Sequence, residues 1–369
     1  MNLNKKNKVI ILSTKAGAGH QVTANSIISL FAADSRINIE IKEYYELNPV
    51  NKFSKKLYRK NIWEVYNQLQ RKGKSNITYI LLSVFLKIAI SITKRKAARA
   101  LKSFLAEKKP ELVISVIPLV NHIIYNATNE LKITFLTLMI DFSEPAKNVW
   151  FQHKKQKMIV CTEKALKQAE KFGIRKEDIY FINGALIDPK YYRIKEKSEN
   201  DELNNHILLI WGGEGCNRML KYIKRLEESD IEQVFIYCIG SNPGAEHEVK
   251  KLIKRCDSLV VNYTNEIENY YIKSKLIVGK PGPGVISEAL FLNKYLLMEL
   301  NSKTLLQERF NARWVADQGC GRLFKNEEEL VSNIKLFLQS EIRMQAVINN
   351  SNEKITQLIY EALQITSVG

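Results

Sequence analysis

Three times in this chain a short apolar run leads into a glycine-rich turn and then into a helical pattern. The apolar runs are Val9–Leu12, Ile207–Trp211 and Leu276–Val278. A buried strand that returns through a helix is the repeating unit of a parallel α/β sheet, because parallel strands need a long crossover. The repeat therefore predicts a doubly wound α/β fold, and its return at Ile207 predicts a second sheet.

Further apolar runs separated by helical patterns complete both sheets. Between the two halves, Asp188–Asn205 is polar and without usable periodicity, which predicts an interdomain linker. We expect two Rossmann-like domains, 1–190 and 191–349, with parallel sheets facing across a cleft. An amphipathic run, Asn350–Ile365, predicts a helix within 350–369 that crosses back to the first domain. The other expected strands are Ile37–Ile41, Leu112–Ile117, Ile133–Ile140, Met158–Cys161, Ile179–Ile182, Val234–Ile239, Leu259–Val261 and Tyr295–Met298.

The third glycine turn, in Val278–Leu290, is the most informative for chemistry. Its sequence is V-G-K-P-G-P-G-V-I-S-E-A-L. Glycines let backbone approach a ligand closely, and the N-terminus of the following helix attracts anions. Glu288 would repel a phosphate but is well placed to accept hydrogen bonds from ribose hydroxyls. The stretch therefore predicts a nucleotide site. The alternative is an ordinary strand–turn–helix with Glu288 in solvent.

The chain is strongly basic, and its charge is unevenly distributed. Its 369 residues carry a formal net charge of +17, and residues 51–110 hold 16 lysines and arginines against two acidic residues. Such a field attracts a polyanion, either nucleic acid or an anionic membrane surface. The five cysteines form no C-x-x-C pair, which argues against a disulfide framework. The apolar run near the N-terminus is too short for a signal peptide, so we expect a cytoplasmic protein.

The most apolar stretch lies inside this basic region. Ile77–Ile92 predicts a helix that is apolar nearly all round, and its 16 residues include one lysine, fewer than the roughly 20 that span a bilayer. A wide apolar face beside dense positive charge is typical of a helix lying in an anionic membrane interface. The alternative is a core helix followed by a solvated basic helix. The candidate membrane residues are Ile80, Val84, Phe85, Lys94, Arg95 and Arg99.

Six stretches carry a resemblance to a known family. They are S-T-K-A-G-A-G-H (Ser13–His20), I-P-L-V-N-H (Ile117–His122), Asp141–Phe142, W-G-G-E-G (Trp211–Gly215), K-P-G-P-G-V-I-S-E-A-L (Lys280–Leu290) and L-Q-E-R-F-N (Leu306–Asn311). Their order resembles the glycosyltransferases of the monogalactosyldiacylglycerol synthase and processive diacylglycerol glucosyltransferase type, in glycosyltransferase family 28. The resemblance implies the GT-B architecture, in which two Rossmann domains bind the sugar nucleotide mainly on the second. It also implies inverting transfer of a hexose from a UDP-sugar to a lipid acceptor, without an essential metal.

The resemblance implies roles for particular residues of the second domain. Glu288 would hold the ribose, Gln307 and Glu308 would hold hydroxyls of the donated sugar, and Asn311 matches the family's next asparagine. The turn before Gln307, Asn301–Leu305, lacks the family's proline and glycine, so the resemblance does not define the sugar. N–H groups and helix dipoles of the glycine turns can neutralise departing UDP in place of a metal. The turn residues expected near the nucleotide are Gly19, Gly213, Gly215, Pro281, Gly282, Gly284 and Val285.

Inverting transfer also needs a base for the acceptor hydroxyl. His20 lies where the first glycine turn enters its helix, and imidazole titrates near neutral pH. Asp141 follows a strand at the same carboxyl edge. One of the two is expected to be the base while the other orients it; alternatively, Asp141 caps a helix from Ser143. His122 is a candidate for positioning the acceptor, although S-E-P-A-K-N-V-W-F-Q-H after Phe142 replaces the family's histidine-bearing segment.

We therefore expect a UDP-sugar-dependent hexosyltransferase that acts on a membrane lipid such as diacylglycerol. It would lie peripherally on the inner face of the membrane and use no metal or other cofactor. One alternative keeps the GT-B fold but uses a protein or soluble glycan acceptor, or epimerises the UDP-sugar. A nucleic-acid-binding protein is disfavoured, because residues 51–110 interleave few aromatics for base stacking.

Overall fold

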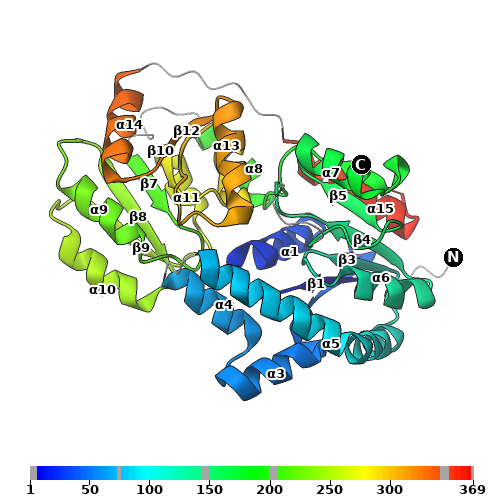
Figure 1. Cartoon of the computed structure of the whole chain (residues 1–369). Helices are drawn as coiled ribbons and strands as arrows, with labels where there is room; N and C mark the ends of the chain where they lie inside the picture. Colours follow the sequence, from blue (N-terminus) through cyan, green and yellow to red (C-terminus); the bar gives the residue numbers. More distant parts are fainter. Residues whose placement is uncertain are drawn as a thin grey trace. The chain divides into compact units, whose positions relative to one another are not determined.

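The computed structural model describes residues 6–72, 76–142, 144, 149–198, 206–340 and 349–366 (Figure 1). The chain divides into two compact units. The first comprises residues 1–66, 80–189 and 349–369, and the second comprises residues 67–79 and 190–348. Each unit contains one six-stranded sheet, so the prediction of two α/β sheets is confirmed.

The sheet of the first unit is parallel throughout, in the order β2-β1-β3-β4-β5-β6. Its centre is β1, where Val9–Leu12 are fully buried because helices cover both faces. The chain leaves β1 toward β2 on one side and later returns to β3 on the other, which makes the β1–β3 boundary a topological switch point. The strands are β1 (Asn7–Ser13), β2 (Ile37–Glu43), β3 (Leu112–Ser115), β4 (Thr134–Leu138), β5 (Lys157–Val160) and β6 (Ile179–Phe181).

One long helix, α5 (Asn76–Lys108), joins the predicted apolar helix to the basic segment after it. Ala97, Leu101 and Leu105 are buried in the core of the first unit, whereas Leu81 and Ile88 are more than half exposed. Core contacts and an exposed apolar face therefore belong to one helix, and contact of that face with a membrane stays a prediction. The other helices here are α1 (Ala18–Leu30), α2 (Tyr44–Leu47), α3 (Pro49–Tyr58), α6 (Asn121–Glu130) and α7 (Glu163–Phe172), while α4 (Ile62–Arg71) has residues in both units.

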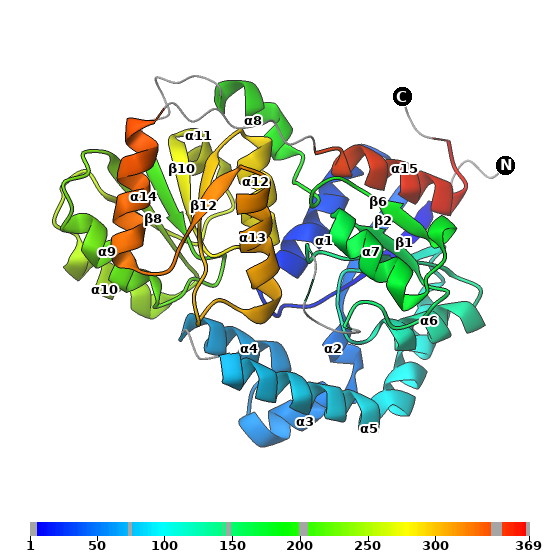
Figure 2. The ribbon, with the colours of Figure 1, turned by 45° about the horizontal axis from the view of Figure 1, so that its top comes forward.

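The C-terminal helix α15 (Ser351–Leu363) belongs to the first unit. Its N-terminal asparagines hold the chain that follows β6. Asn350 Oδ1 accepts a hydrogen bond from Asn183 N at 3.1 Å, and Asn352 accepts from Ile187 N at 3.1 Å while donating to Ile187 O at 2.8 Å. At its other end, Tyr360 donates to Asp34 at 3.0 Å. Figures 1 and 2 show α15 beside α7.

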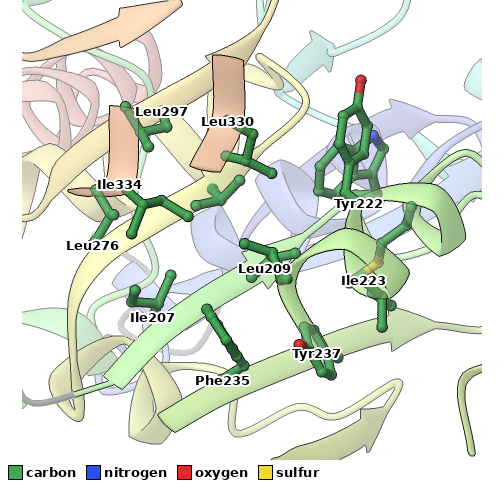
Figure 3. Packing of buried hydrophobic residues seen from close by; sticks show 14 of the residues in the cluster. Ile207, Leu209, Tyr222, Ile223, Phe235, Tyr237, Leu276, Leu297, Leu330 and Ile334 are labelled. Atoms are coloured by element: carbon green, nitrogen blue, oxygen red, sulfur yellow. The ribbon is translucent and has the colours of Figure 1, made fainter. Parts of the chain in front are cut away.

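The sheet of the second unit has the order β12-β11-β10-β7-β8-β9, also parallel. Its switch point lies between β7 and β10. Figure 3 shows the core on one face, where Leu209 and Phe235 lie among Tyr222, Leu330 and other apolar side chains. The strands are β7 (His206–Ile210), β8 (Val234–Gly240), β9 (Leu259–Asn262), β10 (Ser274–Gly279), β11 (Tyr295–Glu299) and β12 (Gly321–Phe324).

Two elements of the second unit differ from the sequence prediction. Strand β12 was not predicted, because four residues containing Arg322 carry no clear apolar run. The predicted linker is in part a helix, α8 (Lys190–Ser198), while residues 199–205 lie outside the described part of the chain. Tyr191 is buried and holds α8 by an edge-to-face contact with Tyr271, a contact that no periodicity reveals. The other helices are α9 (Met219–Glu227), α10 (Pro243–Leu252), α11 (Glu268–Ile272), α12 (Pro283–Phe291), α13 (Arg309–Asp317) and α14 (Glu327–Gln339).

The five cysteines are all unpaired, and four of them are buried. Among the helices of the described ranges, none is both long and apolar enough to cross a membrane.

Candidate functional site

In the first unit, His20 connects the loop after β1 with the loop after β3 by a side-chain contact. It is the third residue of α1, and its Nδ1 atom lies 2.6 Å from the carbonyl oxygen of Val116, just after β3. A carbonyl oxygen only accepts, so Nδ1 carries the proton and Nε2 keeps its lone pair. Burial lowers the pKa of His20 to about 4, although the hydrogen bond to Val116 acts in the opposite direction. At neutral pH the imidazole is therefore neutral, with a basic Nε2.

Asp141 contacts a tryptophan that the sequence did not single out. Its Oδ2 accepts a hydrogen bond from Trp150 Nε1 at 2.7 Å, and the Trp150 and His20 rings lie 6.5 Å apart. We expected either His20 or Asp141 to orient the other, but the Nδ1 atom of His20 is held by the backbone of Val116. Asp141 instead fixes the tryptophan beside the imidazole. Ser143, the start of the alternative capped helix, lies outside the described residues.

His122 belongs to a polar cluster in the first turn of α6. Its backbone N and its Nδ1 lie 3.2 and 3.0 Å from Gln152 Oε1. Burial lowers the pKa of His122, and the charges of Lys94 and His153 add to this effect. The ring of His153 also stacks on Tyr125, with 3.9 Å between centroids. His122 is thus a half-buried neutral imidazole close to the basic part of α5.

In the second unit, two glycine turns lie side by side at the switch point. One follows β7 and the other follows β10, and Gly279 pairs with Ile210 across these two strands. A Cβ atom on Gly279 would lie 2.1 Å from Ile210 O, and one on Gly215 would lie 1.9 Å from Ile239 O. Both turns therefore need glycine to reach this packing. Gly282 is the N-cap of α12 and has no side chain to satisfy the helix's first N–H groups, so these are available to an anion.

Glu288 lies in the second turn of α12, beside two buried tyrosines. Burial raises the pKa of its carboxyl to about 7, although interactions with the hydroxyls of Tyr191 and Tyr271 and the charge of Lys190 lower it. Lys190 itself pairs with Glu268 at 2.5 Å. Glu288 is therefore not the solvated residue of the alternative reading. Its carboxyl is partly buried, and its protonation state changes near neutral pH.

The residues expected to hold the donated sugar make contacts within the unit. Glu308 Oε1 pairs with Lys280 Nζ at 2.9 Å, and Asn311 Nδ2 donates to Pro281 O at 2.9 Å. Gln307 is half-buried next to them. Asn311 thus holds the glycine turn in place, and Glu308 holds Lys280. Contact with a sugar stays a prediction for all three.

A buried network next to these turns was missed by sequence reasoning. Glu299, at the end of β11, is fully buried and lies 3.2 Å from Arg218 Nη1. The same carboxylate accepts hydrogen bonds from Tyr222 at 2.8 Å and from Asn301 at 3.0 Å. The sequence signal that could have indicated this network is Glu299 itself, an acidic residue that ends the apolar strand β11. The network connects the loop after β7 with the loop after β11.

An apolar surface, defined by the exposed large side chains of α3 and α5, lies on the first unit. Figures 1 and 2 show α3 running along α5, and the rings of Tyr58 and Phe85 meet edge to face at 6.5 Å. Phe85 is half-buried in this contact, whereas Lys94, Arg95 and Arg99 are exposed. The exposed apolar residues are Phe53, Leu57, Tyr58, Ile80, Leu81, Val84, Ile88 and Ile92.

Two models of known protein families match this chain, one in each half of the sequence. Residues 20–183 match the monogalactosyldiacylglycerol synthase model, and residues 207–362 match the glycosyltransferase family 28 C-terminal domain. Monogalactosyldiacylglycerol synthase 1 of Arabidopsis thaliana is 27% identical over 358 residues, which cover 89% of this chain and 64% of that protein. A processive diacylglycerol beta-glucosyltransferase of Bacillus pumilus is 23% identical, covering 95% of this chain and 91% of that one.

The fold is also found in solved structures. S. aureus MnaA, solved with UDP, superimposes with a TM-score of 0.62 at 13% identity, over 98% of each chain. At this identity the likeness concerns the fold alone. Together with the two parallel sheets, it confirms the predicted GT-B architecture of two Rossmann-like units.

Proposed function

The chain belongs to glycosyltransferase family 28, as a member that joins a monogalactosyldiacylglycerol synthase domain to the family's C-terminal domain, and from this premise we propose that it transfers a hexose from a UDP-sugar to a diacylglycerol-type lipid. The relatives named for that activity support the lipid acceptor. The observation that carries the proposal is structural. Each sheet reverses its strand order at a glycine turn, and His20 and Glu288 lie on the helices that follow two of these turns.

The second unit is proposed to hold the donor. The free N–H groups at the start of α12 suit the diphosphate, and the carboxyl of Glu288, in the second turn of the same helix, suits the ribose hydroxyls. An ionised carboxylate accepts hydrogen bonds from both hydroxyls of a ribose, which a neutral side chain does less well. This arrangement supports a nucleoside diphosphate as the ligand.

The first unit is proposed to supply the base. The acceptor oxygen attacks the anomeric carbon while its proton passes to Nε2 of His20, and Nδ1 stays bonded to Val116. The bond between the anomeric carbon and the diphosphate oxygen breaks, and its electron pair leaves with UDP, so that the configuration inverts. The proposed step uses no metal ion.

The apolar surface of α3 and α5 is proposed to rest on an anionic membrane. Its exposed apolar residues have exposed basic neighbours on both helices, including Lys52, Lys55, Lys56, Lys94 and Arg95. Apolar contact plus attraction to anionic headgroups is how peripheral helices bind bilayers. Such docking would bring a lipid hydroxyl to the unit that carries His20.

The test offers a panel of radiolabelled UDP-hexoses with total membrane lipid and measures label in the organic phase. We expect one UDP-hexose to label lipid. His20→Ala should abolish transfer but keep UDP affinity, Glu288→Ala should weaken UDP binding, and His247→Ala, on the exposed face of α10, should match the wild type. Label that stays in the aqueous phase on a protein or glycan, or undiminished transfer by both site variants, would contradict the proposal.

A further inference from the structure

One lysine of the second unit connects three loops at the carboxyl edge of the sheet. Lys280 follows β10 directly, and its backbone oxygen accepts a hydrogen bond from Gly282 N at 2.8 Å. Its side chain reaches the loop after β11, where Nζ lies 2.9 Å from Glu308 Oε1. It also crosses the turn after β7, since a Cβ atom on Gly212 would lie 2.9 Å from its Cε. The strands β7, β10 and β11 are neighbours in the sheet.

This path depends on Gly212. The residue has a φ of 76° and no side chain, so the aliphatic part of Lys280 can pass over the turn. The side chains of Lys280 and Glu308 are 17% and 10% exposed. The ammonium group is thus held in a largely water-excluded position next to both glycine turns, where a charge interacts more strongly than in solvent.

We propose that Lys280 binds the diphosphate of the donor and stabilises the negative charge that builds up on departing UDP, with Glu308 as the residue that positions it. The inference rests on the proposed function and deepens it. An ammonium group donates charge-assisted hydrogen bonds to phosphate oxygens. A cation already in place where charge develops lowers the barrier without reorganisation. Glu308 then acts through Lys280 and not through a sugar hydroxyl.

Arg218, a second cation at the end of the loop after β7, is less suitable. Arg218 faces Glu299, a fully buried carboxylate that Tyr222 and Asn301 also contact. Moving Arg218 onto a phosphate would leave a buried charge without its partner, which costs several kcal/mol. Lys280 already lies beside the N-terminus of α12, and its ammonium group has three N–H donors, so it can bind a phosphate and keep its ion pair with Glu308.

The test compares UDP with uridine as ligands of the full chain by isothermal titration calorimetry. Lys280→Met keeps the length of the side chain and removes its charge. It should weaken UDP binding by about tenfold to a hundredfold and leave uridine binding unchanged. Lys280→Arg should retain most of the preference for UDP. Lys273→Met, at the opposite end of β10 and exposed, is the matched control and should behave as the wild type.

A double-mutant cycle tests the role of Glu308. Glu308→Gln should reduce the preference for UDP over uridine in the wild-type background but have no further effect when Lys280 is already Met. An unchanged UDP-to-uridine ratio in Lys280→Met would overturn the inference while leaving the proposed function standing. Failure of the wild-type chain to bind UDP would contradict the proposed function and the inference with it.

Discussion

The Nδ1 atom of His20 lies 2.6 Å from the carbonyl oxygen of Val116, so a backbone group determines which imidazole nitrogen carries the proton. This contact links the loop after β1 with the loop after β3. A backbone carbonyl stays acceptor-only at every pH, whereas a carboxylate partner would lose that role when protonated. The tautomer with a free Nε2 is therefore stable throughout the neutral range.

The low pKa of His20 predicts a pH-dependent stability of the protein. The folded-state pKa is about 4 and the ordinary value is about 6.5, so between these values the unfolded chain binds the proton and the folded chain does not. Stability should fall as pH drops from about 6.5 to 4, by roughly 3 kcal/mol from this residue. Urea unfolding at pH 7 and pH 4 measures it. His20→Gln should remove this part of the loss, and His247→Gln should not. An equal loss in wild type and His20→Gln would contradict the assignment.

The raised pKa of Glu288 predicts that ribose binding strengthens with pH. Its carboxyl is neutral below about 7, and ribose hydroxyls prefer the ionised form. Uridine affinity should therefore rise between pH 6 and pH 8, and binding at pH 6.5 should release a proton. Uridine carries no phosphate, so its titration isolates this contact. Calorimetry in buffers of different ionisation enthalpy measures the released proton.

Glu288→Gln is the control for this prediction. It should bind uridine more weakly at pH 8 and with no pH dependence. The tyrosines that face the carboxyl titrate only at high pH, because their pKa values are raised further by burial. A wild-type uridine affinity that stays flat from pH 6 to pH 8 would show that Glu288 does not bind the ribose in its ionised form.

The sequence was sufficient for elements whose signal is local. Strand β1 was predictable because Val9–Leu12 is an uninterrupted buried run, and the turn at Gly282 because glycines and a following helix mark it. Strand β12 and helix α8 were not, since each is short and is stabilised by contacts with distant residues, as Tyr191 is by Tyr271. The candidate site could not be fully predicted for the same reason, since its contacts also join residues that are distant in the sequence. The sequence singles out His20 and Glu308, but their contacts with Val116 and Lys280 exist only after the sheets have formed.

The buried pair of Arg218 and Glu299 predicts a large effect on stability. Glu299 is fully buried, accepts hydrogen bonds from Tyr222 and Asn301 and forms an ion pair with Arg218. Removing its charge leaves Arg218 uncompensated. Glu299→Gln should lower the free energy of unfolding by roughly 3 kcal/mol, measured by urea unfolding at pH 7. Glu328→Gln, which removes an exposed pair with Arg225, should cost less than about 1 kcal/mol. Equal effects would contradict the structural role of the network.

The exposed apolar face of α5 predicts binding to anionic vesicles. Leu81 and Ile88 are 64% and 55% exposed, and burying each side chain in a bilayer interface contributes about 1.5–3 kcal/mol. Replacing both with glutamate should reduce binding by at least about a hundredfold, because it removes apolar contact and adds repulsion from anionic headgroups. Flotation of the protein with vesicles containing phosphatidylglycerol measures it. Phe85 is left unchanged in this test, because its ring packs on Tyr58 and its replacement would disturb α3.

The control for this experiment is Leu336→Glu on α14, where a leucine is 39% exposed in the second unit. It should float as the wild type does, since that helix carries no comparable basic cluster.

RNase treatment should leave flotation unchanged, because the positive charge of α3 and α5 is expected to act on lipid and not through bound nucleic acid. Binding should weaken as salt rises, since exposed charges are screened within about 10 Å at 0.1 M ionic strength. Flotation of the double variant at the wild-type level would show that charge alone attracts this chain to the vesicle, and that the apolar face of α5 has another use.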